Sequence, residues 1–259
     1  MAEPLAGLAP EIATDLFLGG GLRLRQSARG HRAGTDAVLL AAAAPADFAG
    51  LAIDVGSGVG AAGLALALAR PKARIGLVEI DPAAAALARE NLALNGMADR
   101  GAVFEADIFS PASRRAAGLF DESAGLVITN PPFFDPGRAR LSPQPGKRRA
   151  HAMPEEGPAS LSAWIAACLA LVEPGGSFVL IHRPEALPAI LEGLARRAGG
   201  VAILPIHPRG DASAIRILVR GKKGSRTPVS IAPPLILHEG DRFTDAAEAI
   251  HRGVSMIDW

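Results

Sequence analysis

One segment in the first quarter of the chain has the residue types of a nucleoside-binding loop. It reads Ile53-Asp-Val-Gly-Ser-Gly-Val-Gly60 and joins an apolar run to an Ala- and Leu-rich run. Glycines at a strand-to-helix turn let the backbone bend tightly and approach a ligand closely. Glu79 lies 19 residues after Gly60, where an acid can accept hydrogen bonds from both hydroxyls of a ribose. The pattern therefore predicts an adenosine-containing cofactor, held by Gly56, Ser57, Gly58, Gly60 and Glu79.

Asp54 distinguishes between two classes of cofactor. The stretch Gly58-Val-Gly60-Ala-Ala-Gly63 matches the dinucleotide fingerprint G-x-G-x-x-G, which favours NAD. A carboxylate two residues before the first glycine would, however, repel a pyrophosphate. S-adenosylmethionine has no phosphate and carries an ammonium and a sulfonium group, both cationic. Asp54 therefore favours S-adenosylmethionine, and its alternative role is that of a helix N-cap.

A third acid is predicted to complete the cofactor site. Asp107 follows another predicted strand, and the carboxyl ends of parallel strands meet at one edge of a sheet. We therefore expect Asp107 to lie near Asp54 and Glu79 and to accept a hydrogen bond from the adenine amino group. Ile80 and Ile108 are expected to pack against the faces of the ring. The alternative role of Asp107 is again a helix N-cap.

The segment Asn130-Pro-Pro-Phe133 has the groups needed to activate an amine. The Asn130 side-chain carbonyl and the Pro131 main-chain carbonyl are two acceptors, and Pro132 has no amide that competes for them. Accepting both N–H bonds of an exocyclic base amine stabilises the charge that develops as its nitrogen attacks a methyl sulfonium. Phe133 is expected to stack on the substrate, and Asn130 to border the cofactor as well. The alternative is a proline-stiffened turn with a core phenylalanine.

Basic residues gather in two stretches, one near the N-terminus and one after the Asn-Pro-Pro-Phe segment. On the predicted topology the second stretch lies over the carboxyl edge of the sheet, where substrate must enter. Positive charge there would hold phosphates and orient a target base. The alternative is that both stretches are solvated charge runs. The predicted RNA contacts are Arg29, His31, Arg32, Lys147, Arg148 and Arg149.

Strands and helices alternate along most of the chain, which is typical of a doubly wound parallel sheet. Seven strands are predicted, at residues 51–55, 74–80, 102–105, 125–129, 177–181, 201–206 and 214–220. The last two are joined by a connection too short for a crossover helix, so we expect an antiparallel hairpin. A glycine turn at 19–21 predicts a short N-terminal β-hairpin, and Thr35 is the expected N-cap of the next helix. The predicted fold class is α/β, with a mostly parallel, Rossmann-like, seven-stranded sheet.

Composition excludes several classes of protein. The chain has 259 residues, of which 49% are hydrophobic, and a formal charge of +1. Such a chain can bury a core, which excludes intrinsic disorder, and its charge argues against wrapping nucleic acid over the whole surface. Cys168 is the only cysteine, which excludes an internal disulfide and a cysteine-zinc cluster. With no metal-ligand spacing, signal peptide or membrane span, we expect a cytoplasmic protein without a metal or a membrane partner.

These motifs together resemble those of class I S-adenosylmethionine-dependent methyltransferases that modify amino groups. Residues 15–26, 30–40 and 148–151 further resemble the bacterial valine-tRNA adenine-N6 methyltransferases. That resemblance implies N6 methylation of an adenine beside the anticodon of a tRNA, with Gln26 and Asp36 among the cofactor contacts. It also implies a division into residues 1–46, which cover the site, and a catalytic domain of residues 47–259. His31 departs from the pattern, because an aromatic residue is commoner there.

Other functions stay open at this point. The same chemistry could act on guanine N2 in rRNA or on the glutamine amide of a release factor. The glutamine methyltransferases usually carry Tyr at the position of Phe133 and a separate N-terminal helical domain, whereas this chain has only a short N-terminal segment. An NAD-dependent oxidoreductase would use residues 58–63 but lacks an evident catalytic Tyr-Lys pair, because the chain has no Tyr. A non-catalytic S-adenosylmethionine-binding module would have no use for the Asn-Pro-Pro-Phe segment. Both a monomer and a homodimer remain open.

Overall fold

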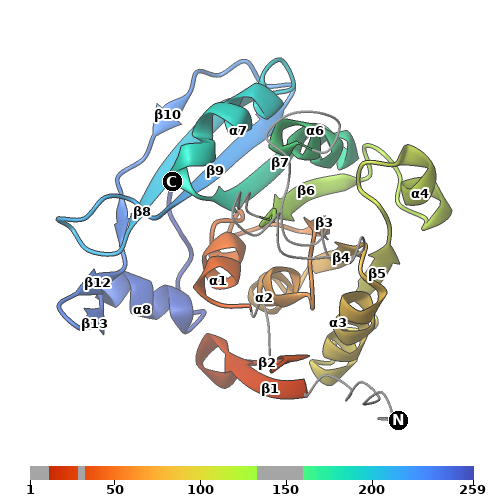
Figure 1. Cartoon of the computed structure of the whole chain (residues 1–259), viewed down its shortest axis with the longest axis horizontal. Coiled ribbons are helices and arrows are strands. Elements are labelled where there is room, and N and C mark those ends of the chain that lie inside the picture. Colours follow the sequence, from red (N-terminus) through yellow and green to blue (C-terminus); the bar gives the residue numbers. More distant parts are fainter. Residues whose placement is uncertain (1–11, 29–32, 133–159) are drawn as a thin grey trace, which may run out of the picture.

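The computed structural model describes residues 12–28, 33–132 and 160–259, in which helices flank a central β-sheet (Figure 1). In these residues the strand order is β10-β8-β9-β7-β6-β3-β4-β5, and β11 also pairs with β8. The seven main strands are β3 (Gly50–Val55), β4 (Ala73–Glu79), β5 (Gly101–Glu105), β6 (Ala124–Thr129), β7 (Val172–His182), β8 (Ala198–His207) and β9 (Arg216–Lys223). The predicted seven-stranded sheet is confirmed, and two-residue strands β10 (Ser230–Ile231) and β11 (Leu235–Ile236) extend its edge.

Strand direction changes only at the side of the sheet formed by the later strands, β8 and β9. Strands β3, β4, β5, β6 and β7 form parallel pairs, whereas β9 runs antiparallel to both β7 and β8. The short connection from β8 to β9 allows no crossover, and this explains the predicted hairpin. β10 and β11 each pair in parallel with β8.

Both faces of the sheet are buried, because successive strand residues point to opposite sides. Ala52, Leu126 and Ile128 belong to one apolar cluster, whereas Ile53 and Val127 belong to another. Helices α1 (Thr35–Ala42), α2 (Ala61–Ala69) and α3 (Pro82–Leu94) lie along one side of the sheet, and α6 (Leu161–Leu171) and α7 (Leu187–Leu194) lie along the other (Figure 1). The carboxyl ends of the parallel strands therefore form one edge between two helical layers.

Capping residues explain where several helices begin and end. The Asp81 carboxylate accepts hydrogen bonds from the Ala83 and Ala84 amides at the start of α3, as its sequence predicts. The prediction that Thr35 caps α1 is wrong. Gly34 occupies the cap without a side-chain bond, and the Thr35 hydroxyl lies 3.3 Å from His251 Nε2 instead.

The remaining elements are short. They are the 3₁₀ turns η1 (Leu18–Gly20) and η2 (Pro184–Ala186), α4 (Pro111–Ala116), β12 (His238–Glu239), β13 (Arg242–Phe243) and α8 (Asp245–His251). The turn η2 leads directly into α7, which ends at Leu194 because its cap residue Ala195 leaves the helical region at ψ 134°. Thr244 is the N-cap of α8, since its hydroxyl accepts from the Ala247 amide.

Two asparagines on α3 hold the N-terminal hairpin, which consists of β1 (Ile12–Phe17) and β2 (Leu22–Ser27). The Asn91 side chain accepts from the Arg25 amide at 2.7 Å and donates to the Arg25 and Val59 carbonyls at 2.9 and 3.0 Å. One turn later, Asn95 bonds to both main-chain groups of Arg23. Each amide side chain thus satisfies main-chain groups of β2, and Asn91 also ties β2 to the glycine-rich loop. The predicted division at residue 46 stays a prediction.

Replacing Asn91 by alanine is expected to lower the free energy of unfolding by roughly 2–4 kcal/mol, because three main-chain groups lose their partner in a buried place. Asn91 is fully buried, so water cannot replace the amide. Urea denaturation measures the effect. The matched control is Asn95→Ala, where the site is partly exposed and the loss should stay below about 1 kcal/mol. Equal losses in the two variants would contradict the stabilising role proposed for the buried hydrogen bonds of Asn91.

Candidate functional site

The strand order creates a crevice position at the centre of the sheet. From β3 the chain continues to β4 on one side, whereas β6 lies on the other side of β3. Val55 at the end of β3 is opposite Thr129 at the end of β6. The loop after β3 and the segment after β6 therefore start side by side at the carboxyl edge, which is where doubly wound sheets bind ligands.

The loop after β3 has the backbone conformation that its glycines predict. Gly56, Gly58 and Gly60 have φ values of 70°, 56° and 91°, in the region that favours glycine. A Cβ atom on Gly60 would also lie 2.8 Å from Leu77 Cδ1. Any larger residue at Gly60 would therefore meet both backbone strain and a clash with the underlying strand β4.

Glu79 ends β4 beside this loop, and its carboxylate is oriented by main-chain amides. One oxygen accepts from Gly58 at 2.8 Å, and the other accepts from Ile80 and Asp81 at 2.9 Å each. Glu79 is partly exposed. The carboxylate is thus held at the loop in a fixed orientation, which suits the predicted contact with ribose hydroxyls.

Asp54 is buried beneath the loop. It is 2% exposed, and its Oδ2 accepts a hydrogen bond from the Gly63 amide in the first turn of α2 at 2.8 Å. Gly60 occupies the cap position of α2, so Asp54 is not its N-cap, although its carboxylate binds an amide in the first turn of that helix. Burial raises the pKa of Asp54 from 3.8 to about 7, with the Gly63 bond opposing and the negative charge of Glu79 adding to the rise. Its predicted contact with a cationic cofactor stays a prediction.

The raised pKa of Asp54 predicts a pH-dependent stability. Between pH 4 and pH 7 the folded protein keeps a proton on Asp54 that the unfolded chain has lost, so the free energy of unfolding falls as the pH rises. With a pKa of about 7, the loss between pH 5 and pH 7.5 should be about 2–3 kcal/mol. Asp54→Asn keeps an acceptor for Gly63 without the charge, so denaturation curves of this variant should lack that part of the slope. If the free energy of unfolding depends on pH equally in the wild type and in Asp54→Asn, the raised pKa of Asp54 is contradicted.

The proposed adenine-binding residues lie at the ends of β4 and β5. Asp107 lies two residues beyond β5, and its Oδ1 accepts from the Phe109 amide at 3.0 Å. Its contact with the adenine stays a prediction. The Ala106 amide donates to the Glu79 carbonyl, so the two segments are neighbours. Ile80 is 42% exposed and Ile108 is 4% exposed. Only Ile80 therefore offers an open apolar face to a ring.

Asn130 follows β6 directly and has an unusual side chain. Its Oδ1 atom is buried and has no hydrogen-bond partner in the part of the chain that the structure describes. A buried acceptor without a partner costs about 1–3 kcal/mol, so this atom is suited to receive a donor from a ligand. The Ser57 hydroxyl in the glycine loop is also buried and unpartnered among the described residues. Pro131 is buried and Pro132 is half-buried.

Gln26 and Asp36, expected as cofactor contacts, hold the N-terminal segment in this structure. Gln26 donates to Asp15 Oδ2 and accepts from the Ala33 amide at 2.8 Å. Asp36 forms an ion pair with Arg216 of β9 at 2.8 Å. A cofactor contact of Gln26 or Asp36 stays a prediction. The predicted residues that lie outside the described part of the chain are Phe133, Arg29, His31, Arg32, Lys147, Arg148 and Arg149.

The structure adds buried polar residues that sequence reasoning did not assign to the site. They are Asn91, Thr129 and Trp164, which are 0%, 0% and 8% exposed. The one available signal was the spacing of Asn91 and Asn95, which places two amides on one face of a helix. Nothing local in the sequence marks Thr129 or Trp164, because each acts through a partner on another element.

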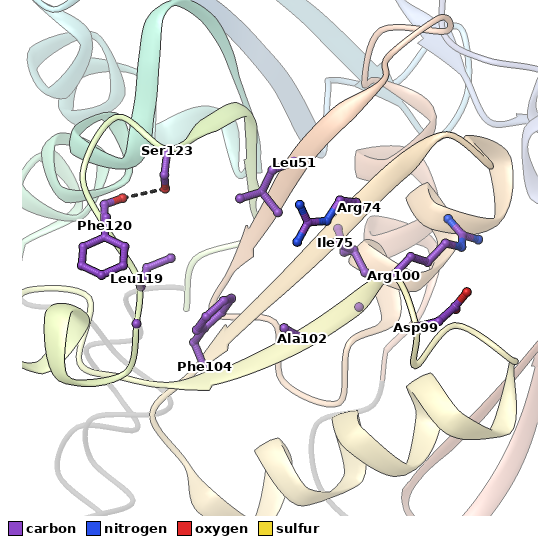
Figure 2. Close-up of a pocket in the computed structure, with 12 residues that line it drawn as sticks. Leu51, Arg74, Ile75, Asp99, Arg100, Ala102, Phe104, Leu119, Phe120 and Ser123 are labelled. Carbon is purple, nitrogen blue, oxygen red and sulfur yellow. Dashed lines mark hydrogen bonds between the residues drawn. The ribbon is translucent and has the colours of Figure 1, made fainter.

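A separate hollow lies away from this edge (Figure 2). Its lining includes Leu51, Ile75 and Ala102, which lie near the first residues of β3, β4 and β5. The glycine loop and Asn130 lie at the opposite ends of these strands, so the hollow is no part of the candidate site. Among the described residues, none of the helices has the length and apolar character needed to cross a membrane.

Known proteins match the chain in sequence and in structure. The family model described as "Methyltransferase small domain" matches residues 29–142. A Porphyromonas gingivalis protein named tRNA1(Val) (adenine(37)-N6)-methyltransferase is 34% identical over 174 residues, which cover 66% of each chain, just under two thirds. A Serratia proteamaculans protein of the same name is 32% identical over 77% of this chain and 76% of its own. A crystal structure of a "predicted O-methyltransferase" from Agrobacterium tumefaciens has a TM-score of 0.72 and 34% identity, and covers 86% of this chain and 98% of its own.

Proposed function

This chain belongs to the class I S-adenosylmethionine-dependent methyltransferases, and we propose that it methylates N6 of an adenine in tRNA, beside the anticodon. The cofactor is S-adenosylmethionine, which supplies the methyl group when bound. Relatives named for adenine-37 N6 methylation of tRNA1(Val) support the choice of base.

The residues of the site fit this cofactor. Close packing beneath Gly60 shapes the loop, and the Ser57 hydroxyl and Asn130 Oδ1 are buried acceptors that lack partners among the described residues. Glu79 provides an oriented carboxylate. We expect Glu79 to hold the ribose, Asp107 the adenine amino group, and the glycine loop the remaining main-chain contacts.

The single observation that carries the proposed reaction is the unpartnered, buried Oδ1 of Asn130 beside the glycine loop. An exocyclic amine has two N–H bonds, and its lone pair is delocalised into the ring. Asn130 would accept one N–H bond and the Pro131 carbonyl the other, which stabilises positive charge as it develops on nitrogen. A hydroxyl has one proton and needs a base, so two neighbouring acceptors favour an amine over the oxygen acceptor in the name of the Agrobacterium protein.

Methyl transfer to unmodified tRNA tests the proposal. We expect the purified protein to methylate a valine tRNA transcript, and mass mapping to place the methyl group on one adenine beside the anticodon. Tritium transfer to a release-factor peptide or to rRNA, without transfer to tRNA, would favour the rival substrates. Tight NAD binding without binding of S-adenosylhomocysteine would contradict the choice of cofactor.

Replacing Arg148 and Arg149 together by alanine is expected to raise the KM for tRNA and to flatten the salt dependence of binding. Each lost phosphate contact lowers the slope of log K against log salt by about one for duplex-like RNA. Fluorescence anisotropy at several salt concentrations measures the slope. The control is Lys72→Ala with Arg74→Ala, two exposed cations near the start of β4, at the opposite edge of the sheet. An unchanged slope in the Arg148 and Arg149 variant would reduce this stretch to a solvated face.

A further inference from the structure

Two consecutive buried hydrogen bonds link the ends of β3 and β6 beneath the site. The Trp164 indole Nε1–H donates to the Thr129 hydroxyl at 3.0 Å. The Thr129 hydroxyl donates to the Val55 carbonyl at 2.8 Å. Because a hydroxyl has one proton, the direction of both bonds is determined: indole to hydroxyl to carbonyl. The two bonds thus join α6, the end of β6 and the end of β3.

The two strand ends that these hydrogen bonds link lead directly into the site. Val55 precedes Gly56 of the glycine loop, and Thr129 precedes Asn130. The Trp164 ring also contacts the loop, since a Cβ atom on Gly56 would lie 3.0 and 3.1 Å from its Cζ2 and Cη2 atoms. Phe109 packs edge-on against the same indole with ring centroids 5.7 Å apart. One side chain therefore touches the cofactor loop and, through Thr129, the segment that carries the proposed amine acceptor.

We propose that Thr129 and Trp164 are positioning residues that set the spacing between Asn130 and the glycine loop. The inference rests on the proposed methyl transfer, in which the amine held by Asn130 must face a methyl group held at the loop. Neither side chain touches substrate, and both act through their neighbours. Misplacing a reacting group by about 1 Å can cost about 10²-fold in rate. Losing the hydrogen bonds that fix the distance between the two loops should therefore lower the rate constant more than it lowers the affinity for ligands.

Valine, serine and phenylalanine substitutions separate positioning from folding. Thr129→Val keeps the shape but removes the hydroxyl, and we expect the single-turnover rate constant to fall about 10–100-fold. Cofactor affinity by calorimetry should change little. Thr129→Ser restores the hydroxyl and most of the rate. Trp164→Phe removes the indole donor, and its rate constant should lie between those of Thr129→Val and Thr129→Ser. Rates are expressed per cofactor-binding site, so that loss of folded protein does not count.

Thr244 provides a control, because its hydroxyl also donates to a main-chain carbonyl and accepts one hydrogen bond, away from the site. It donates to the Ile236 carbonyl at 2.7 Å and accepts from the Ala247 amide at 3.2 Å. Thr244→Val is expected to lower stability, because a hydroxyl with two partners is lost there as well, but to leave the rate constant unchanged. Equal rate losses in the two variants would overturn the positioning role, as would a wild-type rate in Thr129→Val.

An indole signal tests these hydrogen bonds without any methyl acceptor. The chain has two tryptophans, and Trp259 donates its Nε1–H to the Ala43 carbonyl. With ¹⁵N-labelled tryptophan, S-adenosylhomocysteine should shift the Trp164 indole resonance in the wild type and in Thr129→Ser, and leave the Trp259 resonance in place. The response should be lost in Thr129→Val. If the wild type fails to methylate tRNA, the proposed function fails. If bound S-adenosylhomocysteine does not shift the Trp164 indole resonance of the wild type, the inference is overturned.

Discussion

Replacing Asn130 by alanine is expected to lower the single-turnover rate constant for methyl transfer by about 10²–10³-fold, the scale for losing one preorganised partner of a developing charge. The buried Oδ1 atom of Asn130 lacks a partner among the described residues, so in the free enzyme the change takes no hydrogen bond from this atom within that part of the chain. The loss therefore falls on the transition state. Rapid-quench measurements at saturating cofactor separate this step from product release.

Cofactor affinity is the internal control for Asn130→Ala. We expect calorimetry with S-adenosylhomocysteine to give nearly the wild-type dissociation constant, because the proposed role of Asn130 Oδ1 is to accept from the amine, so its contact with the cofactor should contribute little. Asn95→Ala is the matched asparagine variant, since its amide bonds to β2 on the far side of α3, and its rate constant should stay near that of the wild type. An unimpaired rate in Asn130→Ala would reduce the Asn-Pro-Pro segment to a structural turn.

Replacing Glu79 by alanine is expected to weaken cofactor binding by about 1.5–3 kcal/mol, the scale for hydrogen bonds to a charged group. This corresponds to roughly a 10–150-fold rise in the dissociation constant. Two effects are expected to add: the ribose hydroxyls would lose the proposed acceptor, and the Gly58 amide would lose the carboxylate that it binds. Calorimetry with S-adenosylhomocysteine measures the change.

Two variants separate the contributions of Glu79. Glu79→Gln keeps one acceptor oxygen without the charge, so it should lose less affinity than Glu79→Ala. Glu105 is the matched control, because it is the register partner of Glu79 on β5, and its carboxylate pairs with Arg89 at 2.6 Å. Glu105→Ala should bind the cofactor like the wild type. A wild-type dissociation constant in Glu79→Ala would show that the carboxylate does not contact the ribose.

Features encoded over short stretches could be predicted from the sequence. Asp81 caps α3, Gly96 follows that helix with φ 64°, and glycines form the turn after β3. Each depends on the conformational preference of one residue or on a bond within three residues, so local pattern suffices. The alternation of strands and helices likewise predicts a doubly wound sheet, because parallel strands need crossover helices.

Other expectations failed or stayed open because tertiary contacts compete with local preference. Thr35 is a good N-cap residue, but its hydroxyl lies against His251, 216 residues away. Asp54 was assigned to a cationic ligand, yet its carboxylate also bonds to the Gly63 amide. A carboxylate has several acceptor positions, so the two roles are compatible, and the sequence alone does not distinguish them.

The sequence by itself determined the kinds of groups available: a glycine turn, an acid at the end of each of three strands, and an amide followed by two prolines. The tertiary structure decided which of these meet. Strand order places Val55 beside Thr129, 74 residues apart. The packing of α3 against the N-terminal hairpin places Asn91 beside Arg25, 66 residues apart. Such pairings follow from register and from the packing of whole helices, and no preference within a short stretch of chain encodes them. For the same reason, only the folded chain brings Trp164 beneath both loops of the site.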